Sequence, residues 1–156
     1  MARSRDKMRA PFQVLVLPFH RDSSGDYLFC ALKRSDANVW QGIAGGGHEG
    51  ETPIIAAARE AHEESGIPEG SQIYPLDSKT SIPRNHFKAS SEWDNSFYVV
   101  KEHSFAVESP DLQILLSDEH TEVKWGTFEE IGRLFTWDSN RTALWELHQR
   151  LKDGRI

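Results

Sequence analysis

Three glutamates at helical spacing are the residues of this 156-residue chain best suited to chemistry. Glu60, Glu63 and Glu64 lie within the segment Thr52 to Ser65, at positions i, i+3 and i+4. At about 100° per residue they fall on one side of a helix. Like charges at this spacing repel by roughly 0.2–0.5 kcal/mol per pair, and Arg59 alone does not neutralise three carboxylates. The other side of the same helix carries Ile54, Ile55, Ala58, Ala61 and His62.

The surrounding residues decide between two explanations for this charge. A solvated acidic face and a site for a hard divalent cation both agree with three glutamates alone. However, Gly45 lies six residues before Glu51, Glu51 lies eight before Arg59, and Arg59 to Ile67 reads Arg-Glu-Ala-His-Glu-Glu-Ser-Gly-Ile. The pattern is G-x5-E-x7-R-E-U-x-E-E-x-G-U, where U is apolar. At residue frequencies of roughly 5–7%, a chance match is on the order of 1 in 10⁸ per window. The pattern therefore favours the metal site.

The segment Gly45 to Ile67 matches the Nudix box in full, so the chain resembles the Nudix hydrolase family. The resemblance implies an α/β fold, an α/β/α sandwich with a mixed β-sheet, formed by residues 1–156 as one domain. It implies that Mg²⁺, for which Mn²⁺ can substitute, is held by the Gly45 carbonyl and by the carboxylates of Glu60, Glu63 and Glu64. In the family pattern Arg59 and Glu51 orient these carboxylates.

The chemistry expected of such a site is hydrolysis of a phosphoanhydride bond. Metal ions neutralise the non-bridging phosphate oxygens and lower the pKa of a bound water, and a carboxylate then takes the water's proton. We expect Glu63, Arg59 and an acidic residue outside the box to be catalytic. Glu119 and Glu122 lie just before a predicted strand, and we favour Glu119. An exposed acidic loop is the alternative interpretation.

Three further stretches resemble the dihydroneopterin triphosphate pyrophosphatase branch of the family, which releases pyrophosphate from a pterin triphosphate in folate biosynthesis. They are Trp40-Gln41, Glu119-His120 followed by Lys124-Trp125, and Trp137 to Arg141. This likeness implies that Glu119 is a further metal ligand. It also implies a set of substrate contacts: Arg9, Lys33, Ala44, Arg84, Asn85, His86, Phe87 and Thr136.

The likeness to this branch is incomplete, so other substrates stay open. Lys33 stands where the branch has an arginine, and the region from Arg84 to Ser96 aligns loosely. Nucleoside triphosphates, dinucleoside polyphosphates and nucleotide sugars are the alternative substrates. A non-catalytic Nudix-fold binding module is the alternative from another functional class, although the chain retains every glutamate of the box.

Composition and charge limit the classes of partner that we expect the protein to bind. The net charge is −6, which disfavours binding to a nucleic acid polymer. Arg3, Arg5, Lys7 and Arg9 resemble the start of a signal peptide, but the apolar run that follows is too short for a signal peptide or a membrane span. We expect a cytoplasmic monomer or homodimer acting on a small phosphorylated molecule, with Cys30 as a core residue.

Hydrophobic patterning predicts the elements that position the site. Strands are expected at residues 12–19 and 27–33, joined as a hairpin, and at 96–100 and 122–126. Helices are expected at 52–65, 127–135 and 140–152, with Thr52 and Thr127 as N-caps and Gly66 ending the first. Residues 73–87 look extended but interrupted by Pro75 and Pro83. Residues 35–41 and 107–117 are expected to be loops, and the glycine-rich stretch 42–47 allows close backbone approach.

Overall fold

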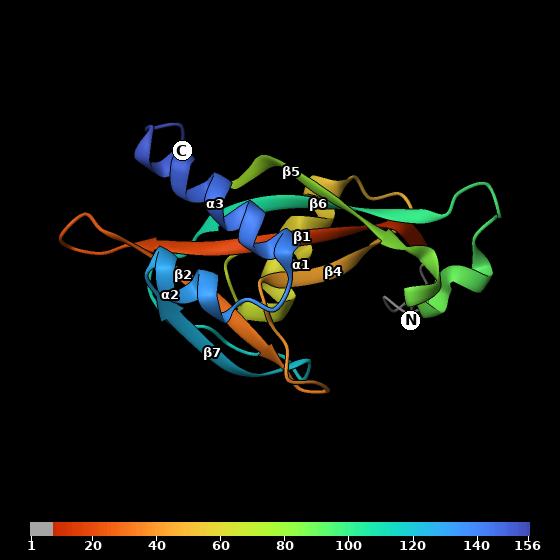
Figure 1. Ribbon diagram of the computed structural model, residues 1–156, viewed down its shortest axis with the longest axis horizontal. Coiled ribbons are helices and arrows are strands. Elements are labelled where there is room, and N and C mark those ends of the chain that lie inside the picture. The colour runs from red at the N-terminus through yellow and green to blue at the C-terminus, as the bar shows by residue number, and fades with distance from the viewer. Residues whose placement is uncertain (1–7) are drawn as a thin grey trace.

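The computed structural model describes residues 8–156, so the basic side chains of Arg3, Arg5 and Lys7 lie outside the described residues. Within residues 8–156 a seven-stranded mixed sheet forms the centre of the molecule (Figure 1). Its strands are β1 (Arg9–Arg21), β2 (Tyr27–Arg34), β3 (Trp40–Gln41), β4 (Ile43–His48), β5 (Ile73–Pro83), β6 (Val99–Glu108) and β7 (His120–Gly126).

Strand β1 organises the sheet. It pairs in parallel with β6 along one edge, and β6 pairs antiparallel with β5. Along the other edge, β1 pairs with β2 only beside the hairpin and with β4 over the rest of its length. Strand β2 therefore diverges from β1 and pairs instead with β3 and β7. The mixed sheet expected from the sequence is confirmed.

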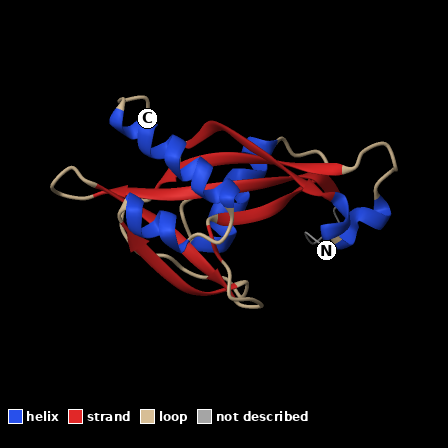
Figure 2. Cartoon of the chain, in the orientation of Figure 1, coloured by secondary structure: helices blue, strands red, loops and turns tan. Residues whose placement is uncertain are grey.

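Helices cover both faces of the sheet (Figure 2). Helix α1 (Pro53–Ser65) packs on one face, and α2 (Phe128–Leu134) and α3 (Asp138–Lys152) pack on the other. Successive side chains of a strand point to opposite faces, so Leu15 and Leu17 of β1 join the α2/α3 core while Val14 and Val16 join the α1 core. Two short 3₁₀ helices, η2 (Arg84–His86) and η3 (Lys88–Glu92), connect β5 to β6.

The predicted helix ends are confirmed. Thr52 caps α1 by accepting a hydrogen bond from the Ile55 amide at 3.4 Å, and Gly66 ends the helix with φ of 76°. Thr127 and Glu130 form a reciprocal capping box at the start of α2. Cys30 is 1% exposed, as expected of a core residue, and burial raises the pKa of its thiol. No helix within residues 8–156 has the length and apolar character needed to cross a bilayer.

Helix α1 does not bury its apolar side and expose its acidic side, as a simple amphipathic helix would. Ile54 and Ile55 are 42% and 54% exposed, whereas Glu60 and Glu64 are only 8% and 3% exposed. Glu60 and Glu64 therefore face the protein, together with Ala56, Ala57 and Ala61, whereas Glu63 is exposed. Hydrophobicity alone does not predict this orientation, because the carboxylates find polar partners in the interior that are distant in the sequence.

Strand β6 is longer and later than predicted. Residues 96–98 precede the strand, which spans Val99–Glu108 and includes the start of the predicted loop 107–117. The sequence of this strand does not alternate between apolar and polar residues as a half-buried strand should, because Glu102 and Ser104 are polar and yet buried. The glycine-rich stretch also forms a strand, β4, and the predicted loop 35–41 ends in the two-residue strand β3.

Candidate active site

Arg59 joins the acidic side of α1 to the glycine strand β4. Its Nε and Nη2 donate to the two carboxylate oxygens of Glu51 at 2.8 and 3.0 Å. Nη1 donates to Glu60 and to Glu63, each at 2.9 Å, and Nη2 also donates to the Gly46 carbonyl at 2.8 Å. The hydrogen bond from Arg59 holds the pKa of Glu51 below its usual value. This network fixes the carboxylates relative to β4, which is the orienting role that the box pattern implies.

Gly45 leaves space for the carboxyl group of Glu60. A methyl group at Gly45 would overlap all three atoms of that carboxyl group. Burial raises the pKa of Glu60 to about 7, against the opposing effect of Arg59, and the charges of Glu63 and Glu64 raise it further. A cation bound beside Glu60 would relieve this penalty.

Two carboxyl groups from distant segments meet beside Glu60. Glu64 of α1 accepts a hydrogen bond from Ser117 Oγ at 2.6 Å and lies against Glu119. Burial raises the pKa of Glu119, and its hydrogen bond to Glu64 raises it further. His120 Nδ1 lies 3.3 Å from Glu64, yet neither ring nitrogen makes a hydrogen bond within residues 8–156. Glu119, favoured from the sequence, is thus brought to the glutamates of the box.

The donor set has the chemistry of a divalent metal site. Carboxylate oxygens and a backbone carbonyl are the ligands that Mg²⁺ prefers, and the cradle at Gly45 holds one of the carboxylates. In residues 8–156, however, no three carboxylate, imidazole or thiol groups are grouped closely enough to form a ready-made site. Glu60 and Glu63 are bound to Arg59, and Glu64 is bound to Ser117. Metal binding would therefore require some of these side chains to change partners.

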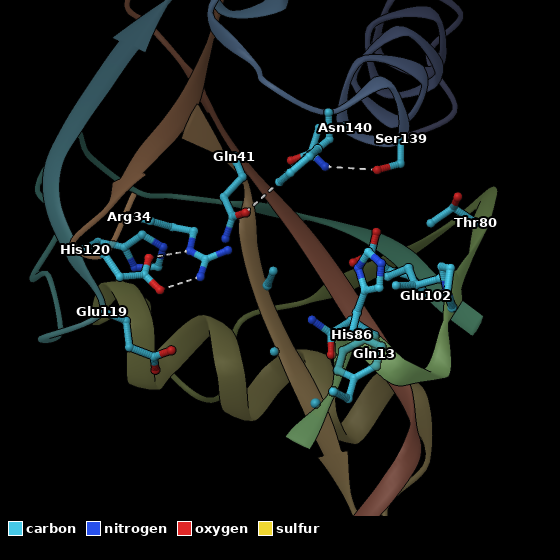
Figure 3. Close-up of a pocket in the computed structure, with 18 of the residues that line it drawn as sticks. Gln13, Arg34, Gln41, Thr80, His86, Glu102, Glu119, His120, Ser139 and Asn140 are labelled. Atoms are coloured by element: carbon cyan, nitrogen blue, oxygen red, sulfur yellow. Dashed lines mark hydrogen bonds and ion pairs between the residues drawn. The ribbon is translucent and has the colours of Figure 1, made fainter. Parts of the chain in front are cut away.

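A cavity of about 780 Å³ lies beside the acidic cluster (Figure 3). Its wall includes several residues expected from the sequence to contact substrate or metal: Arg9, Ala44, Gly45, His86, Phe87 and Glu119. Ala44, Gly46 and Gln13 line the cavity from the same face of the sheet as Leu15, which packs in the α2/α3 core. The cavity floor therefore lies on the face of the sheet that α3 covers elsewhere. A cavity of this size accommodates a small phosphorylated heterocycle.

Arg9 is one of two arginines in the described cavity wall, the other being Arg34. Its guanidinium occupies the space that a side chain at Gly46 would fill, and it lies 5.0 Å from the ring centroid of Phe87. Nη2 donates to Gln13 Oε1 at 2.7 Å, whereas the buried Nε has no partner within residues 8–156. Burial lowers the pKa of Arg9, although the Glu60 carboxylate acts in the opposite direction. An anionic ligand would satisfy this group.

Comparison with known proteins places the chain in a family. The sequence pattern of the NUDIX domain matches residues 11–146. The chain belongs to the Nudix hydrolase family. A solved Nudix hydrolase from Listeria monocytogenes is 43% identical with a TM-score of 0.82, and the alignment covers 93% of this chain and 97% of that one.

Two further relatives of this Nudix protein carry more specific names. The dihydroneopterin triphosphate pyrophosphohydrolase of E. coli is 25% identical with a TM-score of 0.72, and the alignment covers 94% of this chain and 99% of that one. An RNA pyrophosphohydrolase from Rickettsia bellii is 33% identical over 106 residues, which are 64% of this chain. The match spans 66% of that relative, slightly less than two thirds of its length.

Four residues that the likeness to the pterin branch placed near the substrate lie outside the cavity wall of this Nudix protein. Lys33 pairs with Glu122 at 3.4 Å and does not line the cavity, whereas the next residue, Arg34, does. Arg84 donates to the carbonyls of four loop residues, and Asn85 is exposed. Thr136 Oγ1 accepts a hydrogen bond from the Trp40 amide at 3.0 Å. Arg84 and Thr136 thus hold the backbone of neighbouring segments.

The cavity also includes polar residues that sequence reasoning missed. The main ones are Gln13, Arg34, Thr80, Glu102 and Asn140. Asn140 is 3% exposed and accepts a hydrogen bond from the Gly42 amide at 2.8 Å, which fixes the start of α3 to the strand region. A polar residue at a core-facing position of an apolar strand, as at Glu102, was the available signal.

Proposed function

We propose that this Nudix protein hydrolyses a phosphoanhydride bond in a small-molecule diphosphate or triphosphate, with Mg²⁺ or Mn²⁺ as its cofactor. The observation that carries the proposal is the junction of the Glu60, Glu64 and Glu119 carboxyl groups with a cavity that contains the guanidinium of Arg9. Carboxylates alone would repel a diphosphate, so the pairing of acidic ligands with a cavity large enough for a phosphorylated molecule favours a metal-assisted reaction.

We assign each residue of the site a role in the proposed reaction. Glu60, Glu63, Glu64, Glu119 and the Gly45 carbonyl would hold the metal, which when bound neutralises phosphate charge and lowers the pKa of a water. Arg59 positions Glu60 and Glu63 through its Nη1. Glu119 lines the cavity, so it is the carboxylate we assign to take the proton from the attacking water. Arg9, with its free Nε, binds the phosphate chain.

Dihydroneopterin triphosphate is the substrate we favour, with release of pyrophosphate. The E. coli enzyme of that name aligns over 99% of its length with this chain. Phe87 lies at the cavity wall, where an aromatic ring can stack on a flat heterocycle.

A second candidate substrate is the 5′-triphosphate end of an RNA, because a relative at 33% identity is an RNA pyrophosphohydrolase. Such an end has the same phosphoanhydride chemistry as a nucleoside triphosphate. Dinucleoside polyphosphates and nucleotide sugars share this chemistry and complete the set of alternatives.

The test is a substrate panel assayed with Mg²⁺ for release of phosphate and pyrophosphate. The panel contains dihydroneopterin triphosphate, GTP, ATP, diadenosine tetraphosphate, ADP-ribose and a 5′-triphosphorylated oligoribonucleotide. Glu64→Gln should reduce turnover by at least about 100-fold, whereas Glu69→Gln, at an exposed glutamate beyond α1, should not. Equal turnover by the wild type and Glu64→Gln would refute the assigned site. Preference for any other substrate over dihydroneopterin triphosphate would refute the pterin assignment alone.

A further inference from the structure

A row of side chains crosses the cavity floor perpendicular to the strands. Gly46 of β4 pairs with Gln13 of β1, Gln13 pairs with Glu102 of β6, and Glu102 pairs with Thr80 of β5. All four residues line the cavity. Neighbouring strands lie about 4.8 Å apart, so an amide, a carboxyl group and a hydroxyl group stand side by side. This polar row replaces the apolar side chains that the same face carries farther along β1.

Glu102 is the acidic member of the polar row, and it has no protein partner among the described residues. It is 6% exposed, and within residues 8–156 its carboxyl group makes no hydrogen bond or ion pair. Burial raises its pKa to about 7. Burying a carboxyl group without a partner is costly, and this one faces the cavity. The group is therefore available to a ligand that brings its own hydrogen-bond donors.

The position of Glu102 separates it from the acidic cluster around Glu119. In Figure 3, Glu119, His120 and Arg34 lie at one side of the cavity, and Glu102, Thr80 and His86 lie at the other. Gln13 Oε1 accepts a hydrogen bond from Arg9 at 2.7 Å, so its amide nitrogen is left to donate. The far side of the cavity thus offers an acceptor pair beside a donor.

We propose that Glu102 selects the heterocycle of the substrate by accepting hydrogen bonds from adjacent ring N–H and amino groups of a 2-amino-4-oxopyrimidine ring. Gln13 donates to the ring carbonyl of the same edge. Pterins and guanine share this edge, whereas adenine presents a bare ring nitrogen that repels a carboxylate. The proposal rests on the proposed function, because it assumes that the cavity receives the organic part of a phosphorylated substrate.

Binding of the heterocycle alone tests the proposal without any hydrolysis. Wild type, Glu102→Gln and Glu108→Gln are titrated at pH 8, without metal, with neopterin, guanosine and adenosine by calorimetry. Glu108 is an exposed glutamate at the end of the same strand and is the matched control. We expect the wild type and Glu108→Gln to bind neopterin or guanosine at least about tenfold more tightly than adenosine, and Glu102→Gln to lose that preference.

The outcomes separate this proposal from the proposed function. If no triphosphate is hydrolysed but the preference still depends on Glu102, the hydrolase assignment fails and the selection role stands. Suppose that hydrolysis occurs, but Glu102→Gln leaves unchanged both the binding preference and the relative kcat/KM for dihydroneopterin triphosphate, GTP and ATP. The selection role is then overturned. The selection role is also overturned if the wild type binds adenosine as tightly as neopterin and guanosine. The same holds if the wild type binds neither neopterin nor guanosine. The tighter of neopterin and guanosine identifies the source of the ring.

A second variant guards against a folding defect. Glu102→Gln is nearly isosteric, and circular dichroism should show an unchanged fold. Glu102→Asp keeps the charge but shortens the side chain by one methylene, so it should weaken the preference while retaining the acceptor. If both variants fold as the wild type and keep the full preference, Glu102 does not contact the ring.

Discussion

Glu102 should make the stability of the protein fall as the pH rises. Below pH 4.5 the carboxyl group is protonated in both the folded and the unfolded chain, so it makes no difference. Between pH 4.5 and about 7 the unfolded chain releases the proton while the folded chain retains it, because burial raises the pKa of Glu102 to about 7. The free energy of unfolding therefore decreases through this window and is constant above it.

The size of the effect follows from the two pKa values. The interval from 4.5 to about 7, at about 1.36 kcal/mol per pH unit, gives a ceiling of about 3.4 kcal/mol. Water in the cavity solvates part of the carboxylate, so we expect about 2–3 kcal/mol. Glu102→Gln removes this penalty, and the variant should gain that much stability relative to the wild type between pH 4.5 and pH 8.

Urea denaturation without metal, followed by circular dichroism at several pH values, measures this difference. Burial also raises the pKa of Glu60 to about 7, but its contribution is present in both proteins and cancels in the comparison. Glu108→Gln should follow the wild type, since Glu108 is exposed. A stability difference between Glu102→Gln and the wild type that does not change with pH would refute the reasoning.

Three more predictions concern the acidic cluster. Gly45→Ala should lower kcat/KM by at least about tenfold with an unchanged circular dichroism spectrum, because the added methyl displaces the Glu60 carboxyl group; Gly70→Ala, where a methyl meets nothing within 4 Å, is the control. Arg59→Lys should lower the free energy of unfolding by about 1–3 kcal/mol in urea titrations, because lysine lacks the planar guanidinium group that binds several acceptors at once. A loss of stability no larger than that of Arg133→Lys, at an exposed arginine, would contradict this. Chelation with EDTA should abolish turnover and excess Mg²⁺ should restore it, and undiminished turnover in EDTA would exclude a metal-dependent reaction.

The sequence predicted those features that depend on local chemistry. The caps at Thr52 and Thr127 are confirmed, since capping needs only residues three positions apart. The network of Arg59 with Glu51, Glu60 and Glu63 also lies within one short segment, and the resemblance to the Nudix box had implied the orienting roles of Arg59 and Glu51.

Features that depend on pairing between distant strands were harder to predict. Glu102 reaches the cavity because β6 pairs in parallel with β1, and no local pattern encodes that register. Lys33 and Arg34 are adjacent, so predicting which one enters the cavity requires the phase of β2 relative to the sheet. The inward orientation of Glu60 and Glu64 likewise depends on Gly45 and Ser117, which belong to other elements.

The glycine strand β4 has a consequence for how such an enzyme can change. Gly45 faces α1, where the Glu60 carboxyl group fills its missing side-chain space, and Gly46 faces the cavity, where Arg9 does the same. One strand thus separates Glu60, a proposed metal ligand, from Arg9, a proposed substrate-binding residue. Under the proposed roles, mutations at Glu102 or Thr80 would alter the choice of heterocycle and leave Glu60 and Glu64 in place, so new specificities would be accessible through single steps that each leave a working catalyst.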